Sequence, residues 1–125
     1  NSSSGSRFNM KKKERITKNY EYQNVFRRGT SVATRYLVLY FLAEQADITR
    51  AGFVVSKKVG NAVTRNRVKR LLKEAYGIHA YSVKDGYDLV FIARPGAAAI
   101  KYDQAAAEMK RILQKGGLVG FFPPQ

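Results

Sequence analysis

Apolar side chains recur at helical spacing in three segments of this chain, residues 19–28, 64–76 and 103–115. Asn19 and Asp103 have side chains suited to capping the first and third segments. A glycine follows each segment in the position that commonly ends a helix: Gly29, Gly77 and Gly116. The spacing therefore predicts three amphipathic helices. Their predicted apolar faces are Tyr22, Val25 and Phe26; Val68, Leu71, Leu72 and Ala75; and Ala106, Met109, Ile112 and Leu113.

Three other segments have the pattern of β-strands. Residues 35–43 and 87–93 are nearly continuous in apolar side chains and rich in β-formers, and residues 51–58 alternate between two faces. A loop that contains Glu44 and Asp47 joins residues 35–43 to residues 51–58. This short connection predicts that the two strands pair as an antiparallel hairpin. The order is then α-β-β-α-β-α. This order predicts an α+β domain with helices packed on a small sheet.

The length of 125 residues and the hydrophobic fraction of 45% suit one domain with a real core. Residues 1–9 begin with a run of small polar residues and are expected to be a cloning remnant. Met10, followed by three lysines, is expected to be the natural start. A single domain is therefore predicted for residues 10–125.

The charge of the chain indicates an anionic partner. Twenty-three Lys and Arg residues against nine Asp and Glu residues give a net charge of +14, which attracts polyanions. With no cysteine and one histidine, the chain has no disulfide, no thiolate metal site and no cysteine nucleophile. No apolar run approaches the ~20 residues that span a bilayer. We therefore expect a cytosolic protein with no membrane partner.

The second predicted helix concentrates this charge. Residues 57–73 contain seven basic residues and no acidic one. On a helical wheel the polar side chains lie opposite or beside the apolar stripe: Arg65, Asn66, Arg67, Lys69, Arg70 and Lys73. A solvated surface is the alternative interpretation. However, like charges at this spacing repel one another, and selection for solubility alone would mix signs. The pattern therefore favours a face that binds a polyanion.

A turn precedes this helix at Gly60 and Asn61. Both residues allow a tight turn, and the helix N-terminus behind them offers free N–H groups to a phosphate. The glycine spacing differs from that of a P-loop. An ordinary strand-to-helix connection is the alternative interpretation of this segment.

The acidic residues do not suggest a nuclease centre. Two-metal hydrolysis of a phosphodiester needs clustered carboxylates, and the nine acids are scattered. The closest non-adjacent pair, Asp85 and Asp88, is interpreted as turn residues around Gly86. His79 follows the end of the second helix without an evident partner, so a surface or boundary role is expected. We predict no catalytic residue in this protein.

Residues 56–71 read Ser-Lys-Lys-Val-Gly-Asn-Ala-Val-Thr-Arg-Asn-Arg-Val-Lys-Arg-Leu. This run resembles the signature of the bacterial ribonuclease P protein subunit. The core of that signature corresponds to Arg65-Asn66-Arg67 and the pair Lys69-Arg70. The resemblance extends upstream through residues 26–31 and covers essentially residues 10–115.

The resemblance implies a specific fold. Family members have a small four-stranded mixed sheet packed with three helices in the order α-β-β-β-α-β-α. They include a left-handed parallel βαβ crossover, as in the second domain of ribosomal protein S5. Periodicity could not have provided this handedness, since the general rule favours the right-handed form.

The resemblance also implies a function. In this family a large RNA is the catalyst, and the holoenzyme removes the 5′ leader of precursor tRNA by magnesium-dependent hydrolysis. The protein would be a subunit that is inactive alone, a monomer in the holoenzyme, and located in the bacterial cytoplasm. Its partners would be the catalytic RNA and the 5′ leader, with Mg²⁺ held mainly by the RNA.

Two RNA-binding surfaces follow from the resemblance. The cationic helix would face the catalytic RNA, with Asn66 as the one possible metal contact. A cleft would hold the single-stranded leader on aromatic rings and lysines: Tyr22, Phe26, Tyr40, Lys57 and Lys58. Stacking rings interleaved with cations suit a single strand. For Tyr22 and Phe26, plain core packing is the alternative.

A small basic ribosomal protein, or another protein that binds structured RNA, fits the charge and size equally well. The run at residues 57–67 separates the two hypotheses, because ribosomal proteins lack it as a unit. A protein-only nuclease is disfavoured, since the carboxylates are not clustered.

Overall fold

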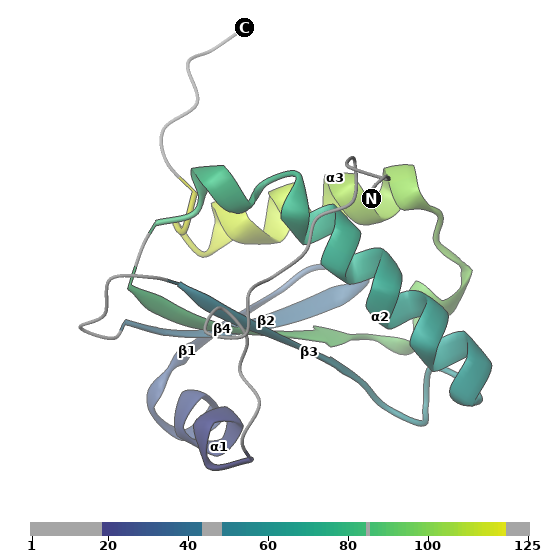
Figure 1. Cartoon of the computed structure of the whole chain (residues 1–125), viewed down its shortest axis with the longest axis horizontal. Coiled ribbons are helices and arrows are strands. Elements are labelled where there is room, and N and C mark those ends of the chain that lie inside the picture. The colour runs from purple at the N-terminus through teal and green to yellow at the C-terminus, as the bar shows by residue number, and fades with distance from the viewer. Residues whose placement is uncertain (1–18, 44–48, 85, 120–125) are drawn as a thin grey trace, which may run out of the picture.

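The computed structural model describes residues 19–43, 49–84 and 86–119. Three α-helices and four strands form this part of the chain, with two short 3-10 helices between them (Figure 1). In chain order the elements are α1 (Asn19–Arg28), β1 (Thr30–Ala33), β2 (Leu37–Ala43), β3 (Arg50–Val55), α2 (Ala62–Gly77), η2 (Ala80–Ser82), β4 (Tyr87–Ala93), η3 (Pro95–Ala99) and α3 (Tyr102–Lys115). The predicted α+β class with a four-stranded mixed sheet and three helices is confirmed.

The strands are arranged in the order β1-β2-β4-β3. β2 pairs antiparallel with β1 and with β4, whereas β3 pairs parallel with β4. The predicted hairpin between residues 35–43 and 51–58 is therefore wrong, because β4 lies between these two strands. A short connection allows a hairpin but does not require one. Leu89, Val90 and Phe91 of β4 are fully buried, as expected for a strand that is paired along both edges and covered on both faces.

The left-handed sense of the β3-α2-β4 crossover stays an expectation of the resemblance. The strand β1 is a further result that the hydrophobic pattern alone missed. Its four residues are mostly exposed at the edge of the sheet, so they have no apolar alternation to detect.

The helices lie on opposite faces of the sheet. α2 and α3 cover one face and α1 covers the other (Figure 1). The main core fills the space under α2 and α3, where the rings of Phe53 and Phe91 stack with centroids 5.4 Å apart. Ala105 is buried on α3 in place of the predicted Ala106, which is half-buried. The other predicted apolar positions of α3 are fully buried: Met109, Ile112 and Leu113.

The helix ends differ slightly from the prediction. α2 begins at Ala62 instead of Thr64, because the Asn61 side chain caps the helix by accepting a hydrogen bond from the Thr64 N–H at 2.9 Å. In α3 the N-cap is Lys101, and the predicted cap Asp103 lies in the first turn. The side chain of Gln104 reaches back to the Lys101 N–H at 3.2 Å and makes this start favourable.

Some predictions concern parts that the structure does not describe. The expected cloning remnant 1–9, the start at Met10, the loop acids Glu44 and Asp47, and Asp85 lie outside the described residues, as does the side chain of Asn19. Among the described helices, none is long and apolar enough to cross a membrane.

Candidate nucleic-acid interface

The cationic face of α2 points away from the core. Val68, Leu72, Ala75 and Tyr76 are buried against the sheet and α3, and the first turn has no acidic residue. The exposed polar positions are Asn66, Arg67, Lys69 and Arg70, and the half-buried ones are Arg65 and Lys73. The structure therefore brings the six predicted RNA-contacting residues together on one helix, as the helical wheel predicted.

Two arginines of this face are partly covered by the protein. Nη1 of Arg67 donates to the Ala98 carbonyl of η3 at 3.3 Å, which leaves most of the five guanidinium donors for another partner. Arg65 lies at the edge of the face, and its Nε is buried without a hydrogen-bond partner within the described part of the chain. This exposed cationic surface can therefore contact several phosphates while its helix stays fixed on the core.

The predicted phosphate turn directly precedes α2. Gly60 approaches Thr64 closely, since a Cβ at Gly60 would lie 2.9 Å from the Thr64 Cγ2. Asn61 already caps the Thr64 N–H, and the residues between them, Ala62 and Val63, are exposed. A phosphate would therefore reach the start of the helix from solvent, and this use of the turn stays a prediction.

The three predicted leader-binding rings gather on the face of the sheet that α1 covers. Phe26 of α1 and Tyr40 of β2 are in edge-to-face contact, with centroids 4.9 Å apart at 72°. Together with Tyr22 they pack on the buried Val25 and Val90. All three residues are half-buried, so core packing covers much of each side chain and leaves part of it at the surface.

The two predicted leader-binding lysines lie beyond the end of the neighbouring strand. β3 ends at Val55, and Lys57 and Lys58 are exposed in the turn that follows it. The aromatic part of the predicted cleft is thus one cluster. The lysines belong to the turn that connects this face of the sheet to α2.

Tyr22 lies directly on the backbone of β3. A Cβ placed on Gly52 would come within 2.7 Å of the Tyr22 hydroxyl oxygen and ring. Burial, and to a lesser degree the charge of Glu21, raises the pKa of the Tyr22 hydroxyl above its usual value of 10. Tyr22 therefore stays neutral at physiological pH, and the missing side chain at Gly52 determines where its ring lies.

We expect Gly52→Ala to displace the Tyr22 ring and to lower the free energy of unfolding by about 1–3 kcal/mol, as overpacking does. Thermal denaturation measures the loss. Gly96→Ala is the control, because a Cβ there meets only Tyr36 atoms at ordinary contact distance, 3.4 Å or more. If Gly52→Ala costs as much in a Tyr22→Ala background as in the wild type, the contact with the ring is not the cause.

An ion-pair bridge that sequence reasoning missed ties α1 to the sheet. Arg50, the first residue of β3, donates from Nε and Nη2 to the two carboxylate oxygens of Asp88 at 3.0 and 2.8 Å. Its Nη1 donates to Glu21 of α1 at 2.6 Å. Asp88 is thus not a turn residue as predicted, because it lies in β4 and is only 3% exposed. The available signal was an acid inside the apolar run of residues 87–93.

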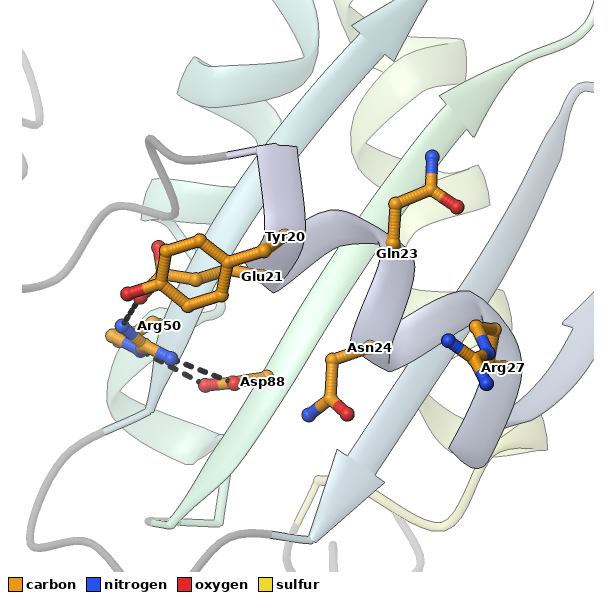
Figure 2. Close-up of a pocket in the computed structure, with 7 residues that line it drawn as sticks. All are labelled: Tyr20, Glu21, Gln23, Asn24, Arg27, Arg50 and Asp88. Atoms are coloured by element: carbon orange, nitrogen blue, oxygen red, sulfur yellow. Dashed lines mark hydrogen bonds and ion pairs between the residues drawn. The ribbon is translucent and has the colours of Figure 1, made fainter.

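A pocket of about 540 Å³ lies beside this bridge, between α1 and the beginnings of β3 and β4 (Figure 2). Its lining consists of Tyr20, Glu21, Gln23, Asn24, Arg27, Arg50 and Asp88. The hydrogen bonds to Asp88, followed by that to Glu21, raise the pKa of Arg50 further above its already high value. The bridging guanidinium therefore keeps its positive charge at neutral pH.

The described residues do not form a protein-only metal site. No group of three or more His, Cys, Asp or Glu side chains among them could hold an ion. Asn66, the one possible metal contact, is exposed between two arginines. His79 is half-buried with its Nε2 3.1 Å from the Ala106 carbonyl, so it has a partner that the sequence did not reveal.

The chain is similar to known proteins over most of its length. Residues 10–117 match the family model described as Ribonuclease P. A ribonuclease P protein component from Natranaerobius thermophilus is 46% identical over 104 residues, which cover 83% of this chain and 90% of that protein. Another from Clostridium botulinum strain Loch Maree is 46% identical over 108 residues and covers 86% of this chain and 97% of its own length.

Solved structures are similar over nearly the same region. The RNase P protein of Staphylococcus aureus superposes with a TM-score of 0.79 at 33% identity, covering 86% of this chain and 98% of that chain. The RNase P protein of Thermotoga maritima gives a TM-score of 0.75 at 25% identity over 82% and 96% of the two chains. Since the family model and these relatives span most of its length, the chain belongs to the ribonuclease P protein family.

Proposed function

We propose that this protein is the RNA-binding subunit of a bacterial ribonuclease P in which the RNA performs catalysis. It binds the catalytic RNA through the cationic face of α2 and the 5′ leader of precursor tRNA through the aromatic cluster under α1. It thereby assists magnesium-dependent removal of the leader and production of the mature tRNA 5′ end. It acts as a monomer within the holoenzyme, in the cytoplasm.

The observation that carries this proposal is the presence of two chemically different surfaces on opposite faces of one sheet. α2 presents cations that suit the phosphates of a structured RNA. The half-buried rings of Tyr22, Phe26 and Tyr40 suit the unstacked bases of a single strand. Lys57 and Lys58 lie in the turn between β3 and α2.

The subunit's own residues bind and orient RNA. Arginines of α2 would hold phosphates of the catalytic RNA with forked hydrogen bonds, and the aromatic cluster would hold the leader in a fixed register. Magnesium supplies activation of water and stabilisation of charge at the cleaved phosphate. Because no group of three or more His, Cys, Asp or Glu side chains among the described residues could hold an ion, we assign magnesium binding mainly to the RNA.

We expect the purified protein alone to leave precursor tRNA intact in magnesium buffer, and the protein with a bacterial catalytic RNA to release a 5′ leader. Gel analysis of labelled precursor measures both reactions. Heat-denatured protein with the same RNA is the control for cleavage by the RNA alone. Cleavage at the mature 5′ end by protein free of RNA would refute the proposed division of labour.

A further inference from the structure

The bridge and the aromatic cluster share the same two elements. Along β3, Arg50 and Gly52 point to the α1 face, because alternate residues of a strand share a face. Along α1, Glu21 and Tyr22 are consecutive. The ion pair of Arg50 with Glu21 therefore lies next to the contact of Gly52 with the Tyr22 ring.

Apolar packing and the bridge constrain α1 in different ways. Val25 is fully buried against the sheet, which fixes the distance of the helix from the strands. The hydrophobic stabilisation of such contacts is non-directional, so it constrains the rotation and sliding of a ten-residue helix less than a directional contact does. A guanidinium fork is directional, since Arg50 is held by both oxygens of Asp88 and extends its remaining arm to Glu21.

The burial of the three groups supports a fixed geometry. The side chains of Asp88, Glu21 and Arg50 are 5%, 15% and 29% exposed. Asp88 belongs to the central strand β4, so it anchors the fork to the most buried part of the sheet. Figure 2 shows the fork reaching from the strands to the first turn of α1.

We propose that Arg50 and Glu21 are positioning residues for leader recognition: the fork on Asp88 sets the register of α1 and so the placement of the Tyr22 and Phe26 rings. The inference rests on the proposed leader binding by these rings. The fork lies on the face of the sheet that α1 covers, beside the pocket at the beginnings of β3 and β4. It acts on the two rings indirectly, through the position of α1.

The test uses the assembled holoenzyme and measures leader selectivity, the ratio of the dissociation constants of leaderless tRNA and of leader-bearing precursor. Glu21→Ala removes the helix end of the bridge and leaves the Arg50–Asp88 fork in place, so the protein should fold. We expect selectivity to fall about threefold or more, a part of the loss expected when a base–aromatic stack is removed. Glu21→Gln keeps a hydrogen-bond acceptor for Arg50 and should therefore retain part of the selectivity that Glu21→Ala loses.

The control is Asp103→Asn, which removes one negative charge from an exposed position on α3. It should leave selectivity unchanged. A second readout is coupling: in a Phe26→Ala background, Glu21→Ala should cause a smaller loss of selectivity than in the wild type, because part of its effect acts through the Phe26 ring. Arg50→Lys should lower selectivity as well, since an ammonium cannot hold both carboxylates in a fork.

The outcomes are distinguishable. If the wild type shows no preference for the leader, the proposed function fails. If the wild type prefers the leader and Glu21→Ala lowers only the melting temperature, the bridge is structural and this inference fails. Additive losses for Glu21→Ala and Phe26→Ala also overturn it, because they would mean independent effects.

Discussion

Combined replacement of Arg65, Arg67 and Arg70 by Ala is expected to weaken binding of the catalytic RNA about 100-fold at 0.1 M salt. Each lost phosphate contact lowers the slope of log affinity against log salt by roughly 0.7–0.9, so three contacts lower it by about 2–3. The affinities should converge near 1 M salt. Titrations at four or more salt concentrations measure the slope.

A matched variant removes the same number of charges from α3, at exposed positions of its last two turns: Lys110, Arg111 and Lys115. Its slope should change by less than that of the α2 variant. The melting temperature of the α2 variant should change little, since Arg67 and Arg70 are exposed. Equal slopes for the two variants would contradict the assignment of α2 as the RNA-facing surface.

Phe26→Ala is expected to have the second largest effect. Loss of a base–aromatic stack costs about 1–3 kcal/mol, so binding of leader-bearing precursor should weaken roughly 5- to 150-fold in the assembled enzyme, with a smaller change for leaderless tRNA. Because Phe26 is half-buried, the free energy of unfolding should also fall, by less than the 3–5 kcal/mol of a fully buried ring. Equilibrium binding and thermal denaturation measure the two losses.

Tyr40→Phe is the companion variant. It keeps the ring that contacts Phe26 and removes only the hydroxyl, so stacking and stability should be retained. If Phe26→Ala instead weakens binding of both RNAs equally and loses the full stability of a buried ring, Phe26 belongs to the core. Other residues would then have to bind the leader.

The sequence was sufficient for features that depend on local periodicity. The apolar stripe of α2 and its cationic face follow from the 3.6-residue repeat, and the structure places them as the wheel predicted. The bounds of α1 and of β4 were also predicted, because glycine, proline and an apolar run mark them locally. The motif at residues 56–71 led to the family.

Strand pairing and the contacts between distant residues depended on the tertiary structure. The short connection after β2 is compatible with a hairpin, but β4, whose residues 88–91 are all buried, lies between β2 and β3. The edge strand β1 has no alternation to reveal it, since its side chains are mostly exposed.

The two parts of the predicted site, the cationic face of α2 and the aromatic cluster, differ in how far they depend on tertiary structure. The six polar residues of α2 lie on one helix, so their positions relative to one another follow from sequence spacing alone. The meeting of Phe26 with Tyr40, and of Arg50 with both Glu21 and Asp88, joins residues from different elements. Sequence alone determined the basic helix and its motif. Only the packing of α1 on the sheet decided the aromatic cluster and its bridge, because pairings over 14 to 38 residues of chain depend on the order of the strands.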